Sequence, residues 1–148
     1  MTRVQIPAAA SYFNIELRVS YMSDDLPEPF EQAIFYEDEK LYACLANYPK
    51  TKGHTVVVWK DEVSDLHLLS KANYKHLMEC VDEIRNVLIE TLGVEKVYLT
   101  YLDETEHVHW HLIPRYNQKG YDVLEHDPGK LEDFSLSDKL KQNLKLEI

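Results

Sequence analysis

Short runs of apolar residues, broken by polar turns, mark out the strands that we expect in this chain. Apolar residues dominate positions 33–36 and 41–46, and the four charged residues between them predict a hairpin turn. Residues 54–60 are rich in β-branched side chains and apolar on both faces, which predicts a strand at the centre of a sheet. A further apolar run at 97–102 predicts a strand that ends in a turn at 103–106.

One longer segment has the periodicity of a helix. Between Ser70, a favourable N-cap, and Gly93, a typical stop signal, apolar residues recur at spacings of three and four. These residues are Tyr74, Leu77, Met78, Val81, Ile84, Val87, Leu88 and Leu92. We also expect a short strand at 17–21, a helical turn at 65–69 and a final helix from Ser137 to Lys145. The pattern predicts a single α+β domain over residues 1–148, with a mostly antiparallel sheet and one long helix packed on it.

Composition restricts the classes of function. The 148 residues are 45% apolar and 28% charged, as in ordinary globular domains. Cys44 and Cys80 are isolated, so neither a disulfide framework nor a thiolate zinc site is predicted. Without a signal peptide or an apolar run long enough to cross a membrane, we expect a cytoplasmic protein that does not bind membranes. The net charge of −10 argues against binding to a nucleic-acid polymer, although a local pocket can still accept a phosphorylated ligand.

The run from residue 107 to residue 113, His-Val-His-Trp-His-Leu-Ile, contains three of the seven histidines. In a strand, His107, His109 and His111 would share one face, and the apolar residues between them would face the core. Three interpretations follow: a solvated face without a role, a site for zinc or copper, or nucleophilic catalysis at phosphorus. A metal site is disfavoured because no further ligand is evident nearby by spacing. Nucleophilic catalysis is favoured, because neutral imidazole is available near pH 7 and can form a phosphoramidate that water cleaves.

This run, followed by Pro114 and Arg115, resembles the His-φ-His-φ-His-φ-φ motif of the histidine triad (HIT) family, in its dinucleoside polyphosphate hydrolase branch. A second match is Gly53-His54 before the strand at 55–58, similar to the Gly-His pair of that family. The resemblance covers roughly residues 30–116 and leaves 117–148 as a C-terminal extension. It implies a HIT-like fold, a homodimer with a continuous sheet, and a nucleotide bound beside the histidines.

The resemblance also implies roles for single residues. His109 would be the nucleophile at an α-phosphate, and His111 would contact the phosphate or assist the leaving group. His107 and His54 would orient the network through hydrogen bonds. Alanine at His109 should abolish turnover and leave the fold intact, because we expect a partly exposed strand position.

Substrate contacts are predicted at two further positions. Asn47 precedes a proline-containing loop where family members place an Asn or Asp on the ribose, and Arg115 is a phosphate neighbour. The covalent step needs no metal or other cofactor, although Mg²⁺ is compatible as a counter-ion of the substrate. His67, His76 and His126 are interpreted as surface or helix-face histidines rather than ligands.

The favoured function is hydrolysis of a dinucleoside polyphosphate of the diadenosine tetraphosphate type through a nucleotidyl-histidine intermediate. One alternative is a nucleotidyl transferase or nucleoside phosphoramidate hydrolase that uses the same histidine. The other is a non-catalytic nucleotide- or zinc-binding module. The turn at 103–106, Asp-Glu-Thr-Glu, replaces the Gly- and Gln-rich loop of many family members, and its acidic character most favours the alternatives.

Overall fold

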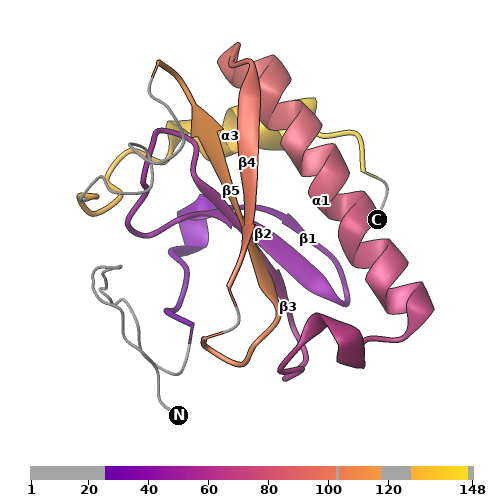
Figure 1. Ribbon diagram of the computed structural model, residues 1–148. Coiled ribbons are helices and arrows are strands. Elements are labelled where there is room, and N and C mark those ends of the chain that lie inside the picture. The colour runs from indigo at the N-terminus through magenta and orange to yellow at the C-terminus, as the bar shows by residue number, and fades with distance from the viewer. Residues whose placement is uncertain (1–25, 103, 118–127, 147–148) are drawn as a thin grey trace.

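In the part of the chain that the structure describes, one antiparallel sheet carries two helices in an α+β fold (Figure 1). The computed structural model describes residues 26–102, 104–117 and 128–146. Over these ranges the order of elements is η1 (Glu31–Ala33), β1 (Ile34–Glu37), β2 (Leu41–Leu45), β3 (Thr55–Trp59), η2 (Leu66–Leu68), α1 (Lys71–Leu92), β4 (Lys96–Tyr101), β5 (His109–Arg115) and α3 (Ser135–Asn143). The predicted fold class is confirmed. The strand predicted at 17–21 lies outside the described residues.

The sheet has the strand order β1-β2-β3-β5-β4, and every neighbouring pair is antiparallel. β3 therefore has a strand on each side, which confirms the central position predicted from its β-branched, two-sided apolar sequence. β4 is the outer strand beside β5. Continuation of the sheet into a second copy of the chain stays a prediction.

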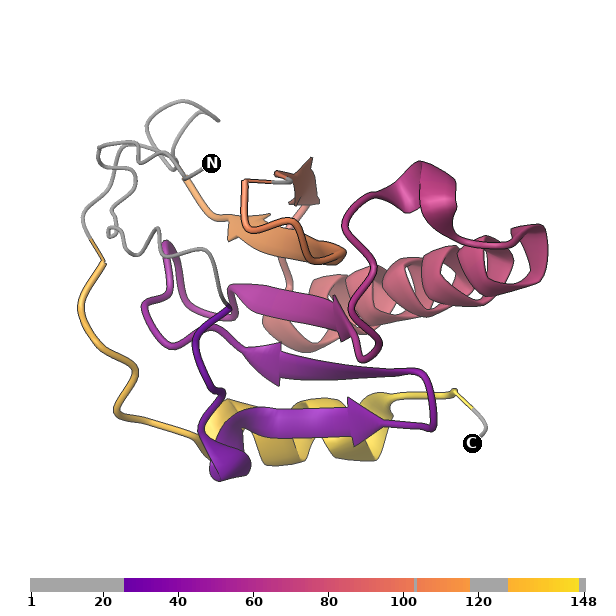
Figure 2. The same cartoon turned by 90° about the horizontal axis from the view of Figure 1, so that it is seen from below.

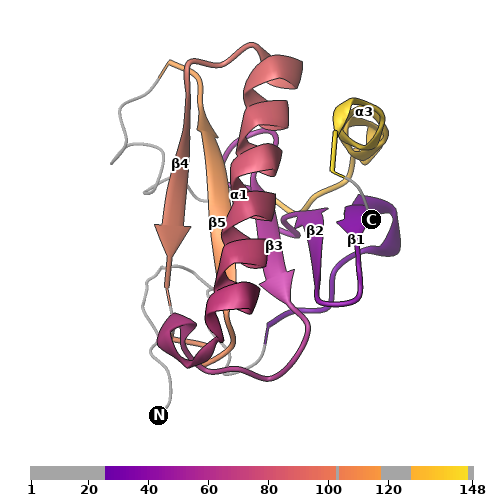
Figure 3. The ribbon, with the colours of Figure 1, turned by 90° about the vertical axis from the view of Figure 1, so that its right-hand side faces the viewer.

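The long helix α1 begins and ends where its sequence signals predict. The Ser70 side chain accepts a hydrogen bond from the Asn73 backbone N–H at 3.1 Å, and Gly93 ends the helix in a left-handed conformation with φ 69°. These two residues satisfy backbone groups that the ends of a helix otherwise leave without partners. Figure 3 shows α1 lying against the sheet, where it contacts β4 and β5.

The final helix lies two residues earlier than predicted, at Ser135–Asn143. Its start is fixed by the Asp133 carboxylate, which accepts a hydrogen bond from the Ser135 backbone N–H at 2.9 Å. α3 packs against α1 and against β1, at the edge of the sheet farthest from β4 (Figure 2). Neither of these helices is long and apolar enough to be a candidate for crossing a membrane in the part of the chain that the structure describes.

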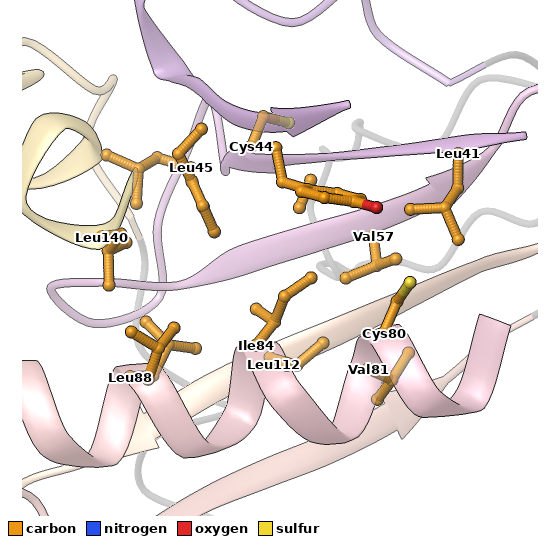
Figure 4. Packing of buried hydrophobic residues seen from close by; sticks show 14 of the residues in the cluster. Leu41, Cys44, Leu45, Val57, Cys80, Val81, Ile84, Leu88, Leu112 and Leu140 are labelled. Carbon is orange, nitrogen blue, oxygen red and sulfur yellow. The ribbon is translucent and has the colours of Figure 1, made fainter. Parts of the chain in front are cut away.

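The core lies between the sheet and the two helices. Figure 4 shows Ile84 and Leu88 of α1 and Leu140 of α3 facing Leu45 and Leu112 of the sheet, and all five are buried. Burial of such side chains contributes about 1.5–3 kcal/mol each to folding, before the loss of conformational entropy is counted. This packing fixes which face of β5 points away from the helices.

Strand register separates the histidines from the core. Val57 is opposite Trp110, whereas Val58 is opposite His109 and Val56 is opposite His111. Directly opposed residues share a face of the sheet, so Trp110 lies on the helix side with Val57, and the two histidines lie on the other side. This confirms the predicted division between apolar and histidine positions for β5.

Candidate functional site

His109 is held in one orientation by its own strand. Its Nδ1 lies 2.7 Å from the carbonyl oxygen of His107, and its side chain is buried. A carbonyl oxygen only accepts, so Nδ1 carries the hydrogen and donates it. In the neutral imidazole the lone pair is then on Nε2. His109 is thus fixed in the tautomer that a nucleophile attacking through Nε2 requires.

A second chain of hydrogen bonds fixes His54 and His111. The backbone N–H of Lys50 donates to His54 Nδ1 at 2.9 Å, so the hydrogen of neutral His54 is on Nε2. His54 Nε2 lies 2.9 Å from His111 Nδ1, and this contact is therefore a donation to His111. The hydrogen of His111 is then on Nε2. The site offers a lone pair on His109 and an N–H donor on His111, whose ring centroids are 5.1 Å apart.

Burial keeps both members of this chain neutral. Desolvation, followed by the positive charge of Lys50, lowers the pKa of His54 to about 3. Desolvation lowers the pKa of His111 well below its usual value, and His109, His54 and Lys50 act in the same direction. A neutral His54 is what the donation from the Lys50 amide requires, because a protonated imidazole has no acceptor. Geometry and electrostatics therefore agree on the tautomers.

The loop before β3 is built to bring the Lys50 amide to His54. Gly53 has φ 89°, a conformation that favours glycine, and it lets the chain turn into the strand. The backbone N–H of His54 donates to Thr51 O at 3.0 Å, and the Thr51 hydroxyl donates to the carbonyl of Pro114 on β5 at 2.7 Å. The loop is thus tied to itself and to the strand that carries the other histidines.

His107 differs from its predicted position. β5 begins at His109, so the expectation that His107 is part of the same strand is wrong. The chain turns at Glu106, which has φ 54°. The backbone N–H of Val108 donates to Val63 O, and the Val108 carbonyl is the last to accept from β3, from Trp59 N at 3.1 Å. The His107 side chain is nevertheless oriented, because Nε2 donates to the carbonyl of Trp59 at 2.6 Å. That bond positions the His107 carbonyl that receives His109.

The two predicted substrate contacts have different surroundings. Asn47 follows Ala46, whose backbone N–H donates to the His54 carbonyl, so it lies near the histidines. Its side-chain amide donates to the carbonyl of Glu28 at 2.8 Å. Arg115 is six residues beyond His109, about 20 Å along an extended strand, and its guanidinium pairs with Glu95 at 3.2 Å. The structure therefore does not bring Arg115 to the histidines.

Two features of the site could not be assigned from sequence spacing. Lys50 contributes a backbone donor and a positive charge to the histidines. In the sequence, only its position shortly before Gly53-His54 indicated this role. The second is a cavity of about 560 Å³ beside His107. Its lining includes Glu62, Ser64 and Glu106, and no lysine or arginine of the described residues contributes to it. The space next to His107 is therefore acidic, and His107 is the one histidine of the site that lines it.

The buried histidine pair predicts that the protein loses stability in mild acid. His54 has a pKa of 6.5 in the unfolded chain and about 3 in the fold, so between these values the unfolded chain binds more protons. The contribution of neutral His54 to the free energy of unfolding is complete above pH 6.5 and is lost progressively as the pH falls toward 3. From pH 7.5 to pH 5 we expect a loss of about 2 kcal/mol from His54, and His111 adds to it in the same direction. Urea unfolding at the two pH values measures the difference.

A matched pair of variants assigns this pH dependence. In His54→Gln the dependence between pH 7.5 and pH 5 should become shallower, because one buried base is removed. In His67→Gln it should match the parent protein, since the His67 side chain is 75% exposed. Equal slopes for the parent and His54→Gln would contradict the assignment.

Comparison with known proteins agrees with this geometry. An uncharacterised HIT-like protein of Methanocaldococcus jannaschii is 30% identical over 115 residues, which cover 74% of this chain and 86% of that protein. A histidine triad protein of Marinobacter aquaeolei has a similar structure, with a TM-score of 0.66 and 18% identity over 75% of this chain and 87% of that one. The diadenosine triphosphate hydrolase of Plasmodium falciparum has a TM-score of 0.58 and 15% identity, with 80% of each chain covered.

The family model of the HIT domain matches residues 29–118, which is more than half of the chain. The match contains the central strand β3, the helix α1 and the strand β5 with its histidines. The chain therefore belongs to the histidine triad family.

Proposed function

We propose that this protein is a nucleotide hydrolase that cleaves a dinucleoside polyphosphate through a nucleotidyl intermediate on His109. The observation that supports this best is the hydrogen bond from His109 Nδ1 to the His107 carbonyl, because it leaves the lone pair on Nε2. The diadenosine triphosphate hydrolase with the same fold supports the choice of substrate class.

The proposed reaction has two steps. In the first, His109 Nε2 attacks the α-phosphorus; a P–N bond forms, and the P–O bond to the departing polyphosphate breaks. His111 Nε2–H donates to a phosphate oxygen and stabilises the charge that develops there. In the second, water attacks the same phosphorus and loses a proton to solvent, the P–N bond breaks, and a nucleoside monophosphate leaves with His109 neutral again. Neither step requires a metal ion, and Mg²⁺ is proposed only as a counter-ion of the substrate.

Positive charge for the phosphates comes from the loop before β3. Lys50 is close enough to His54 and His111 to lower the pKa of both, so its ammonium group also acts on a phosphate bound between the histidines. Asn47 is proposed as the contact to the ribose, because it lies at the same end of the sheet as His54. Arg115 is not proposed as a substrate contact, since its guanidinium pairs with Glu95 at the distant end of β5.

The acidic cavity favours a second candidate, hydrolysis of a nucleoside phosphoramidate. Glu62 and Glu106 line the space beside His107 and would repel the negative charge of a polyphosphate. The same carboxylates would attract a leaving group that carries an ammonium ion. The two candidates share the intermediate on His109 and differ only in the group that departs from phosphorus.

One rapid-mixing experiment tests the function and separates the candidates. The protein is mixed briefly with diadenosine tetraphosphate, or with an adenosine phosphoramidate of a diamine, with and without a chelator, and intact protein and products are analysed by mass spectrometry. We expect a transient adenylyl adduct on His109 and AMP among the products, with the adduct unaffected by the chelator. Faster adduct formation from the phosphoramidate would favour the second candidate. Folded protein that forms neither adduct nor AMP from either compound would contradict both.

A further inference from the structure

A cluster of three potential metal ligands lies away from the histidines of β5. Asp38, His76 and Cys80 each offer one ligand atom, and these atoms all lie within 4.8 Å of one another. His76 Nε2 is 2.8 Å from Asp38 Oδ2 and 3.9 Å from Cys80 Sγ. The cluster joins the β1–β2 turn to α1, two segments about 40 residues apart in the sequence.

Each ligand is held in place by the fold. His76 and Cys80 are four residues apart on α1, so their side chains lie one turn apart on the same face. Figure 4 shows the Cys80 sulfur directed from α1 toward Leu41 on β2. Asp38 Oδ1 accepts the backbone N–H groups of Lys40 at 2.7 Å and Leu41 at 2.9 Å, which turns Oδ2 toward His76. A carboxylate oriented in this way is typical of well-formed metal sites.

The ligand set suits a borderline-soft divalent ion. A thiolate, an imidazole nitrogen and a carboxylate oxygen are the three ligand types that zinc takes in proteins. A tetrahedral site with Zn–S of about 2.3 Å and Zn–N of about 2.0 Å places sulfur and nitrogen about 3.5 Å apart. The observed separation of 3.9 Å is within reach of small side-chain rotations. Two anionic ligands would also neutralise the dication, which lowers the cost of placing its charge in a part-buried position.

Hydrogen bonds hold the Asp38 side chain in place in the unbound cluster. Oδ1 accepts from the backbone of the turn, and Oδ2 lies 2.8 Å from His76 Nε2. The Tyr36 hydroxyl donates to Asp38 Oδ2 at 2.8 Å, so a further oxygen lies beside the cluster. The His76 side chain is 36% exposed, so an ion can approach from that side.

We propose that Asp38, His76 and Cys80 form a binding site for a zinc-class divalent ion, with water or the Tyr36 hydroxyl as the fourth ligand. Binding releases the thiol proton of Cys80 to solvent. The hydrogen of His76 moves from Nε2 to Nδ1 through solvent, so that Nε2 presents its lone pair to the ion in place of its hydrogen bond to Asp38 Oδ2. The site is distinct from the histidines of β5. The His76 ring contacts the Trp59 ring, with centroids 6.4 Å apart, whereas His109 and His111 lie on the face of the sheet opposite α1.

Cobalt(II) titration of the untagged, fully reduced protein tests the proposal. A thiolate bound to cobalt gives a charge-transfer absorption in the near ultraviolet, and imidazoles of the β5 site cannot produce it. We expect one equivalent of cobalt to generate this band together with the visible bands of tetrahedral coordination, and zinc to displace it. The covalent step proposed at His109 needs no metal, so this test and the test of hydrolysis fail independently.

Variants identify the ligands. Cys80→Ala should remove the charge-transfer band, whereas Cys44→Ala, which changes the other buried cysteine, should retain it. Asp38→Asn keeps the shape of the turn and should weaken cobalt binding at least about tenfold. His109→Asn should leave the band unchanged. No thiolate band in the parent protein, or a band that survives in Cys80→Ala, would overturn the proposal, and circular dichroism confirms that each variant is folded.

Discussion

His109→Asn is expected to lower kcat for nucleotide hydrolysis at least about 1,000-fold, equivalent to about 4 kcal/mol of transition-state stabilisation. Asparagine has no nucleophilic nitrogen, so neither the P–N bond nor the adenylyl adduct can form. Its amide can still donate to the His107 carbonyl, as His109 Nδ1 does at 2.7 Å. Turnover and adduct mass, measured on the same samples, report the effect.

Asparagine is a better choice than alanine because His109 is more buried than the sequence suggested. The expectation of a partly exposed position is wrong, since the side chain is 3% exposed. Alanine would leave the His107 carbonyl without its donor and open a cavity, at a cost of about 1–3 kcal/mol. His67→Asn, at an exposed position outside the site, is the matched control and should keep full activity. Activity of His109→Asn within tenfold of the parent would remove His109 as the nucleophile.

Local patterns predicted the elements of the fold well, because their causes are local. Ser70 and Gly93 define α1 through caps that each involve residues within one helical turn. The two-sided apolar sequence of β3 required strands on both sides, and β2 and β5 occupy those positions. The alternation in β5 placed His109 and His111 on one face and Trp110 on the other, as the register confirms.

Other features depend on contacts that no local pattern contains. His107 leaves the strand because Val108 bonds to Val63 and the chain turns at Glu106. The tautomer of His54 depends on an amide of the loop, and Arg115 is drawn to Glu95 rather than to the histidines. His76 was interpreted as a surface or helix-face residue, and only the fold brings Asp38 to it. His76 and Cys80 at a helical spacing of four were the one signal in the sequence.

Gly53→Ala is expected to destabilise the protein by about 2–4 kcal/mol, through both backbone strain and crowding. At φ 89° a side chain is strained in itself. A Cβ would also lie 2.6 Å from Leu92 Cδ1 and 3.3 Å from Pro114 Cγ, so the Leu92 side chain at the end of α1 would have to shift. The same loop presents the Lys50 amide to His54, and we therefore expect activity to fall as well.

Gly93→Ala separates these two causes. Gly93 has a similar φ of 69°, but a Cβ there would meet nothing within 4 Å. Only backbone strain then applies, and we expect a loss of about 1 kcal/mol with activity retained. Urea unfolding of the two variants gives the crowding at Gly53 as the difference between them. Equal losses of stability in the two variants would show that the Leu92 side chain moves aside at no cost. The close approach of the loop before β3 to α1 would then not help to hold His54 in position.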